Sequence, residues 1–458
     1  MLVYLILSGI DDITKTVIPG RIRARDDSSL SNLYTSLPKQ QTTTLMNILK
    51  IFTDYRQLQI FILGAFSAIP LYIIFSTLSA WLTDEHVDLA IITSFAIARI
   101  FYSLKFIWAP IVDQIQLPLL GKVGHRKSWM ILCAGSIAFI LFIMSDLKPS
   151  DSLYELYILT IALGFASATF DVAFDAFRIE KLEPELQALG AANAVFGYRI
   201  GNLIAVAGAL FFADLYGWNS TFFWLSMLYV LAGVYIVTLG ESPIIREKFQ
   251  GLSFHSWKVM TFDPFADFFK RDGAILILAA IIFFKLGDAF LGVVATPFYM
   301  KLGFTKTEIS YVGKIFGVMA TIAGTYIGAY LMYRVGHFKG LIITGIAQSV
   351  TNVSFIWLNH MGHDLNAFII AIAIENIASG MGTVALVGYL SMLCNKQFSA
   401  TQYALLSSAS GLFSHTIVVY GGSLVKLLDW DLYFFGTIIL AIPGILLLIR
   451  LNNKYGNK

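Results

Sequence analysis

The chain has 458 residues, of which 57% are hydrophobic and only 13% are charged, with a mean hydropathy of +0.72. A soluble domain of this length would carry about twice that share of charge, so the composition indicates a membrane protein and excludes a soluble enzyme. The net charge of +3 is too small to indicate a nucleic-acid partner. Two cysteines suggest neither a disulfide framework nor a thiolate metal site, and we expect no metal or cofactor.

Residues 1–57 are predicted to form a polar, disordered cytoplasmic extension. The first ten residues are apolar but far too short to cross a bilayer, and a run of Asp and Arg follows them. A signal peptide would begin with basic residues and end at a small-residue cleavage site, and neither is present. The alternative is that translation begins further downstream and that this segment is not part of the protein.

Twelve apolar stretches follow, each long enough to cross about 30 Å of hydrocarbon as a helix of about 20 residues. Six lie in residues 58–240 and six in residues 273–450, with a linker at 241–272 and a tail at 451–458. We expect a short amphipathic helix near 257–269, on the membrane surface. The predicted spans are 58–82, 89–112, 128–144, 153–177, 188–212, 220–240, 273–297, 309–332, 340–358, 365–392, 401–426 and 432–450.

A basic hairpin occurs once in each half. The string KVGHRK at 122–127 returns 212 positions later as RVGHFK at 334–339, and the same shift places the first six spans almost on the second six. Two copies of one unit are typical of membrane carriers, whose binding site lies between the copies. The sequence therefore predicts an all-α membrane protein with twelve transmembrane helices in two six-helix bundles related by a pseudo-twofold axis.

The hairpins are also candidates for a gate between the bundles. Their glycines permit a tight turn, and their basic side chains can interact with the negative ends of helices and with carboxylates such as Asp113. The alternative is that the positive charge only keeps these loops inside. The candidate gating residues are Asp113, Lys122, Gly124, Arg126, Lys127, Arg334, Gly336 and Lys339.

The orientation follows from the distribution of Lys and Arg among the loops. The segments on the side of both termini hold 23 of these residues and the opposite loops hold four. Positive charge is retained on the cytoplasmic side. We therefore expect both termini and both hairpins in the cytoplasm.

Apart from Glu155 at the outer rim of the fourth span, nine acidic or basic residues inside the predicted spans are candidates, because each costs at least about 2.5 kcal/mol on insertion scales and should face a partner or a wet cavity. None falls in the third, sixth, ninth or twelfth span, so we expect those four helices to pack outside against lipid. The nine are Arg99, Lys105, Asp171, Asp175, Arg199, Lys285, Asp288, Lys314 and Glu375.

The depth of these residues suggests their roles. Arg99, Arg199, Lys285 and Glu375 fall within about 5 Å of the middle of their spans, with Asp288 close behind, where a carrier keeps its substrate site. Burial favours the protonated form of a carboxyl group unless a cation lies beside it. Asp171, Asp288 and Glu375 are therefore the candidates for proton coupling, and Arg99, Arg199 and Lys285 are those for binding anionic groups of a substrate.

Two spacings suggest local pairs, and an alternative applies to all nine residues. Asp171, Asp175 and Arg178 share one helical face, and Lys285 and Asp288 stand three positions apart, close enough to pair. His415 is a further possible proton carrier, although a lone histidine in a helix is more often a packing residue. Any of these charges could instead form a silent ion pair that only sets the register of its helix.

Several segments carry a family resemblance. The hairpins resemble the signature loops of the major facilitator superfamily, although Gly121 and Tyr333 replace the acidic residue that usually precedes the basic one. More narrowly, residues 58–450 are similar to the AmpG permeases, and residues 1–57 have no counterpart there. The segments are WAPIVD (108–113), GHRKSW (124–129), FDVAFDAF (170–177), GYRIG (197–201), KLGD (285–288), ATPFY (295–299) and FSATQYALL (398–406).

This resemblance implies the major facilitator fold and a monomeric inner-membrane permease of a Gram-negative bacterium. Such a permease imports N-acetylglucosaminyl-anhydro-N-acetylmuramyl peptides, released in peptidoglycan recycling, by proton symport. The expected partners are the muropeptide, protons and the lipid bilayer. A carrier of another anionic solute such as acetyl-CoA, or a non-transporting sensor, remains an alternative. Catalysis is disfavoured, because His360 and His363 lie in an outer loop with Asp364 as their one nearby acid.

Overall fold

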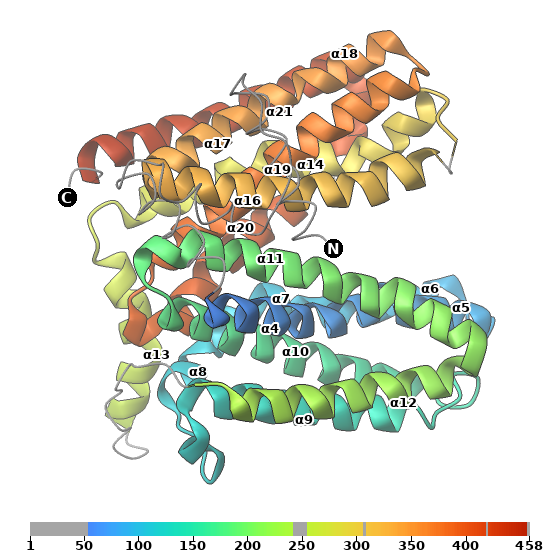
Figure 1. Cartoon of the computed structure of the whole chain (residues 1–458), viewed down its shortest axis with the longest axis vertical. Helices are drawn as coiled ribbons and strands as arrows, with labels where there is room; N and C mark the ends of the chain where they lie inside the picture. Colours follow the sequence, from blue (N-terminus) through green and yellow to red (C-terminus); the bar gives the residue numbers. More distant parts are fainter. Residues whose placement is uncertain (1–53, 241–253, 306–307, 418–419, 456–458) are drawn as a thin grey trace, which may run out of the picture. The chain divides into compact units, whose positions relative to one another are not determined.

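The structure, a computed structural model, describes residues 54–240, 254–305, 308–417 and 420–455 (Figure 1). The chain divides into two units, Met1–Asp54 and Tyr55–Lys458, and every described helix belongs to the second. The predicted extension lies outside the described residues except for its last few positions, as do the first part of the linker and the last three residues of the tail. Every regular element in the described part of the chain is a helix.

The first half contains six spans, several of them interrupted. The first changes to a π-helix in its middle, and the second is broken by two 3-10 turns. Its elements are α4 (Tyr55–Tyr72), η1 (Ile73–Thr77), α5 (Leu78–Asp84), α6 (Leu89–Ser94), η2 (Phe95–Arg99), α7 (Ile100–Leu104), η3 (Lys105–Ile107), α8 (Ala109–Gln114), η4 (Leu120–Val123), α9 (His125–Met144), α10 (Leu153–Lys181), η5 (Pro184–Leu186), α11 (Gln187–Leu203), η6 (Ile204–Gly208) and α12 (Ala209–Thr238).

The second half begins with a linker helix and continues with six further spans. The linker helix, α13, overlaps the segment in which the sequence predicts an amphipathic helix. The elements are α13 (Phe254–Phe269), α14 (Ala274–Lys301), η7 (Ile309–Phe316), α16 (Gly317–Val335), α17 (His337–Thr351), α18 (Val353–Met361), α19 (Leu365–Leu393), η8 (Lys396–Phe398), α20 (Ser399–Ile417) and α21 (Gly421–Tyr455).

Two long helices each contain one residue with non-helical backbone angles, at which the helix is broken. Helix α12 contains Gly217 at φ 80°, and α21 contains Asp429 at φ 60°, 212 positions later. These breaks lie between the fifth and sixth and between the eleventh and twelfth predicted spans. Nine described helices are long and apolar enough to cross a membrane, and one of these, Pro184–Thr238, holds two spans. The second span, which is divided into α6, η2, α7, η3 and α8, and the Ser-rich α20 bring the number of spans to twelve.

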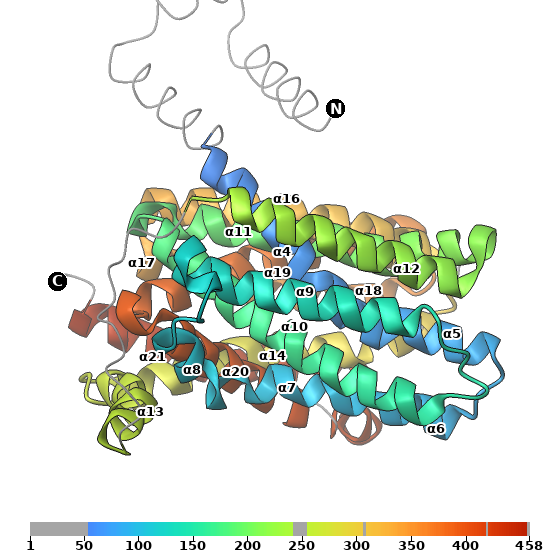
Figure 2. The ribbon, with the colours of Figure 1, turned by 90° about the horizontal axis from the view of Figure 1, so that it is seen from below.

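The helices without internal charges lie at the outside, as predicted. Helix α9 packs on α12 in the first half, and α17 and α18 pack on α21 in the second (Figures 1 and 2). Large apolar side chains on these helices are exposed, among them Phe139 (65%), Leu231 (63%) and Leu446 (59%). Such exposure would be unfavourable in water and is expected of a surface that faces acyl chains.

Helices α4 and α11 approach each other closely through small residues. A Cβ on Gly197 of α11 would lie 2.0 Å from the carbonyl oxygen of Phe61, and one on Gly64 of α4 would lie 2.6 Å from that of Ala194. Small residues allow this approach in membranes, where van der Waals packing holds helices together. The contact fixes the helices that carry Arg199 and Ser67 relative to one another.

Gly197→Ala should therefore destabilise the protein, because the added methyl group forces α11 away from α4. We expect a loss of about 1–3 kcal/mol, typical of overpacking in a tight core. Thermal unfolding in detergent measures it. Gly233→Ala is the matched control, because a Cβ there has no other atom within 4 Å. Equal stability of the two variants would contradict the close approach.

Candidate functional site

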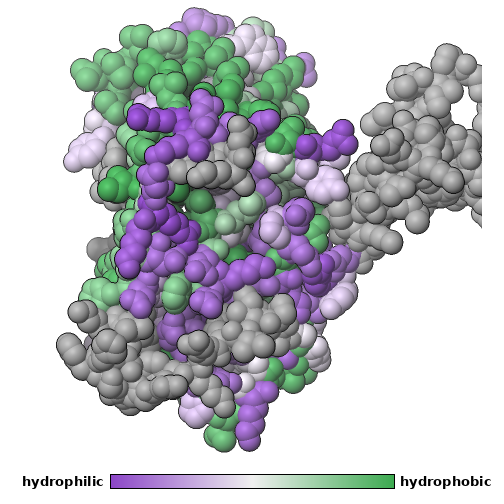
Figure 3. Space-filling view, turned by 90° about the vertical axis from the view of Figure 1, so that its left-hand side faces the viewer, coloured by the Kyte–Doolittle hydropathy of each residue, from purple (hydrophilic) through white to green (hydrophobic). Residues whose placement is uncertain are grey.

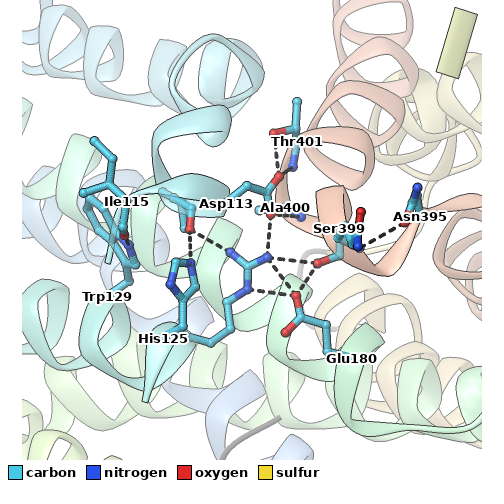
Figure 4. Close-up of polar contacts among 12 residues, drawn as sticks. Asp113, Ile115, His125, Trp129, Glu180, Asn395, Ser399, Ala400 and Thr401 are labelled. Atoms are coloured by element: carbon cyan, nitrogen blue, oxygen red, sulfur yellow. Dashed lines mark hydrogen bonds and ion pairs between the residues drawn. The ribbon is translucent and has the colours of Figure 1, made fainter. Parts of the chain in front are cut away.

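Arg126, in the first turn of α9, lies at the centre of a buried ionic cluster. Figure 4 shows its partners Asp113, Glu180 and Ser399. Its Nη2 lies 2.5 Å from Asp113 Oδ1 and 2.7 Å from Glu180 Oε1, and its Nε donates to Glu180 Oε1 at 2.9 Å. The side chains of all three residues are fully buried. Removing one member of such a cluster leaves an uncompensated buried charge, which costs about 3–5 kcal/mol.

The same cluster binds the start of α20, which belongs to the other half of the chain. Asp113 accepts hydrogen bonds from the backbone N–H of Ala400 (3.1 Å) and Thr401 (2.7 Å) and from the Thr401 hydroxyl (2.6 Å). The Ser399 hydroxyl donates to Glu180 at 2.5 Å and accepts from Arg126 at 3.1 Å. A carboxylate satisfies the free N–H groups at a helix N-terminus and the positive end of its dipole. The halves are thus joined here by buried polar contacts.

This geometry supplies the acidic partner that the first hairpin lacks at Gly121. Asp113 lies upstream of the hairpin, at the end of α8, and reaches both Arg126 and α20. Lys127 acts within the first half, where its Nζ donates to the carbonyl oxygens of Val237 (3.0 Å) and Leu239 (2.5 Å) at the end of α12. Lys122 is exposed.

The second hairpin repeats the turn and omits the cluster. Gly124 (φ 135°) and Gly336 (φ 84°) both adopt positive φ and cap the following helix. Arg334 and Lys339 are exposed, and Phe338 occupies the place of Arg126 and packs on a tyrosine ring 5.2 Å away. The two copies therefore share a backbone and differ in chemistry.

The linker helix is tied to the same end of α20. The amide of Gln402, fully buried, accepts from the backbone N–H of Asn395 (2.7 Å) and from Arg271 (3.1 Å) and donates to Asp267 (2.7 Å) and the Pro264 carbonyl (3.1 Å). Burial opposes ionisation of Asp267, but the hydrogen bonds from Gln402 and Arg271 outweigh it and lower the pKa of the carboxyl group. Hydrophilic side chains gather across this end of the molecule (Figure 3).

A second charged group lies deeper in the first half. The Nζ of Lys105, in η3, contacts Asp171 of α10 directly and lies 3.8 Å from Asp175. The hydroxyl of Ser67, in α4, donates to the other oxygen of Asp171 at 2.7 Å. The side chains of Lys105, Asp171 and Asp175 are 7%, 17% and 14% exposed. Three helices therefore converge on one acidic pair.

A third charged group lies in the second half. Lys285 of α14 lies 3.4 Å from Asp288 and donates to the hydroxyl of Thr383 at 3.0 Å. Their side chains are 20% and 25% exposed, so the pair is not sealed off. Glu375 of α19 accepts from its neighbour Asn376 at 2.7 Å and is close enough to both members of the pair to interact with them electrostatically. The predicted pairing of Lys285 with Asp288 is present.

The remaining predicted residues are dispersed. Arg99 stacks on Phe75 of η1, with its guanidinium 3.6 Å from the ring centroid, and is exposed. Arg199 of α11 is half-buried and interacts electrostatically with Tyr72. The side chains of Lys314 and His415 lie outside the described part of the structure.

Comparison with known proteins decides the family. The profile of the Major Facilitator Superfamily matches residues 60–364. A protein of Rickettsia conorii named as transporter AmpG 4 is 54% identical over 411 residues, which cover 89% of this chain and 99% of that protein. The anhydromuropeptide permease of Escherichia coli K12 is 34% identical over 403 residues, 88% of this chain and 80% of that protein. The chain belongs to the AmpG family of the major facilitator superfamily.

Solved structures agree on the fold of this AmpG-family transporter. The human organic anion transporter MFSD10 superposes with a TM-score of 0.60 at 13% identity, over 86% of this chain and 99% of that one. A bacterial homologue of the iron transporter ferroportin gives the same TM-score and identity, over 88% and 99%. The predicted all-helical major facilitator fold is therefore confirmed, and the chain is a multi-pass membrane transporter.

Three contributors to the Arg126 cluster of this AmpG-family member are not predicted from the sequence: Glu180, Ser399 and Thr401. Glu180 lies just beyond the predicted end of the fourth span, so the span pattern does not mark it as buried. Ser399 and Thr401 are neutral and give no charge signal. The strongest available signal is the segment FSATQYALL, which carries the family resemblance without indicating a role for these side chains.

Proposed function

We propose that this transporter imports anhydro-muropeptides from the periplasm to the cytoplasm of a bacterium, across the inner membrane and together with protons. It acts as a monomer by alternating access, with both termini in the cytoplasm. The observation that carries the proposal is the placement of charge: the Lys105–Asp171–Asp175 group and the Lys285–Asp288 pair lie on inner helices, and the outer helices present apolar side chains. The name of the Escherichia coli relative supplies the substrate class.

We assign some of the charged residues to substrate binding and others to proton binding. Lys285, Arg99 and Arg199 are proposed to bind the carboxylates of the peptide and sugar moieties. Asp171, Asp288 and Glu375 are proposed to take up and release the coupled proton. The partial exposure of Lys285 and Asp288 supports this assignment, because a substrate can reach them, whereas a sealed ion pair would be structural.

Alternating access requires a junction that forms and breaks. The contacts of Asp113, Arg126 and Glu180 with α20 join the two halves at the α13 end, which we take as the cytoplasmic end. We propose that this junction is the cytoplasmic gate of the transporter and that it opens to release bound substrate into the cytoplasm. In this proposal Gly124 and Gly336 provide the turns of the hairpins. The basic side chains of the hairpins keep these loops in the cytoplasm and interact with the ends of helices; they are Lys122, Lys127, Arg334 and Lys339.

Uptake into membrane vesicles tests the function. Labelled anhydro-muropeptide should accumulate when an acid-outside pH gradient is imposed, and a proton uncoupler should abolish the accumulation. Acetyl-CoA in a parallel assay should not accumulate. Vesicles that take up acetyl-CoA and no cell-wall fragment would contradict the proposal, as would muropeptide accumulation that is indifferent to the uncoupler.

Arg199→Gln should weaken binding of the anionic substrate. One charge-assisted hydrogen bond to a carboxylate contributes about 1.5–3 kcal/mol, which is a rise of roughly 10- to 100-fold in the Kd. Binding of labelled muropeptide to the purified protein measures it, with Lys148→Gln in an outer loop as the exposed-charge control. An unchanged Kd would make Arg199 a structural residue.

A further inference from the structure

Arg178 forms a second contact between the halves, separate from the Arg126 cluster. It lies in the last turn of α10, and its side chain is fully buried. Its Nη1 donates to the hydroxyl of Ser391 in α19 at 3.0 Å, and its guanidinium lies 5.3 Å from the ring centroid of Tyr403 in α20. Both partners belong to the second half, and both are neutral.

The charge of Arg178 is compensated from its own half. Its Nη2 lies 3.4 Å from Asp175, which is also 3.8 Å from Lys105, and Lys105 contacts Asp171. Two carboxylates therefore balance two cations in a buried group. The other titratable side chains that interact with this group come from α7, α11, the end of α19 and α20, and they are Tyr102, Tyr198, Cys394 and Tyr403.

Arg178 is held less completely than Arg126. The Nε of Arg178 is buried and has no hydrogen-bond partner in the described structure, whereas that of Arg126 donates to Glu180. Its distance to Asp175 is also at the long end for a hydrogen bond. The position of Arg178 between the halves therefore depends on the charge of the neighbouring carboxylates, because its hydrogen bonds alone do not fix it.

We propose that Arg178 is the positioning residue that couples protonation of Asp175, in the Asp171–Asp175 pair, to separation of the halves at the α13 end. The inference rests on the proton coupling proposed above and specifies how it reaches the gate. A proton taken from solvent by Asp175 removes the counter-charge that lies 3.4 Å from Arg178. Asp171 stays in contact with Lys105, so the cation left without a counter-charge is Arg178.

An uncompensated guanidinium facing only Ser391 and Tyr403 is unfavourable in a dry site. Movement of α10 away from α19 and α20 would admit water to it. The same turn of α10 carries Glu180, which binds Ser399 and Arg126. Displacement of this turn thus strains the Arg126 cluster as well, and loss of the proton restores both contacts.

The test measures the separation of the halves against pH. Spin labels are placed at Leu119 and Gln397, both exposed and one in each half, as L119C and Q397C in a C133A/C394S background. Pulsed electron resonance in lipid nanodiscs reports the long-distance population at about pH 7.5 and pH 5.5. In the parent we expect the ratio of long to short distances to rise by about tenfold on acidification, which corresponds to about 1.4 kcal/mol.

Arg178→Gln should raise the long-distance population at pH 7.5 and reduce its pH dependence to less than about twofold. Arg178→Lys, which keeps the charge, should restore the pH dependence, and this rescue separates coupling from a merely structural role. The parental pH dependence in R178Q would overturn the inference. So would failure of R178K to restore a response that R178Q lacks.

Transport distinguishes this inference from the proposed function. In vesicles, R178Q should still exchange labelled for unlabelled muropeptide, while stimulation of uptake by the pH gradient should fall by about tenfold. A parent that shows no gradient-driven uptake would contradict the proposed function. A parent with gradient-driven uptake and an R178Q variant that retains full stimulation would overturn the role of Arg178 alone.

Discussion

Asp288→Asn is expected to abolish concentrative uptake while leaving the protein in the membrane. The carboxylate lies 3.4 Å from Lys285 and is within 3.4 Å of the Ser379 hydroxyl, so the amide retains the shape and part of the hydrogen bonding of the site. What it loses is the ability to bind and release a proton. A carrier without that group should reach only equal concentrations on both sides, so the accumulation ratio falls to about one.

Glu375→Gln should behave in the same way, because Glu375 interacts electrostatically with the Lys285–Asp288 pair. Accumulation is followed in vesicles under an imposed pH gradient, and the amount of inserted protein is measured by immunoblot. Asp151→Asn, at an exposed position in an outer loop, is the matched control and should accumulate substrate like the parent. Full concentrative uptake by both D288N and E375Q would remove these residues from proton coupling.

Arg126→Gln is expected to open the junction between the halves. The substitution leaves Asp113 and Glu180 buried without their common cation, which costs about 3–5 kcal/mol and shifts the balance between closed and open forms by a factor of roughly 10²–10⁴. Asp113 retains its bonds to the start of α20, yet its charge is no longer neutralised. The closed form should lose its preference, and uptake should fall because the gate no longer closes.

The reactivity of Cys394 reports this opening. Its thiol lies at the end of α19 and is buried, as is that of Cys133 within α9. A membrane-impermeant maleimide applied from the cytoplasmic side should modify Cys394 at least about tenfold faster in R126Q, with Cys133 remaining slow. Lys396→Gln removes an exposed charge next to α20 and should leave the rate unchanged. Parental labelling rates in R126Q would show that the cluster does not hold the gate closed.

The repeated halves explain why only one hairpin forms such a junction. Position 126 is Arg and position 338 is Phe, although both follow a glycine with positive φ at the same place in the repeat. Duplication preserves the backbone, which is decided by turn geometry and hydrophobic length. The side chains have diverged, so one copy holds the bundles together through charge and the other packs on an aromatic ring.

The residues by themselves determined the membrane-spanning, duplicated, all-helical fold. Apolar length, the repeated glycine hairpin and the cost of charge in hydrocarbon act locally, so they can be recognised along the chain. The absence of charge from every third helix likewise predicted which helices face outward. The pairing of Lys285 with Asp288 could also be predicted, because three residues on a helix bring side chains together.

Only the tertiary structure decided which distant groups meet. Asp113 and Thr401 are 288 positions apart, a separation that no helical period relates, and their contact depends on how the two bundles close. The same holds for Glu180 with Ser399 and for Arg178 with Ser391. The physical reason is that a sequence pattern reports the environment a side chain requires, buried or wet, charged or neutral. The partner that satisfies it is selected by packing of the whole chain.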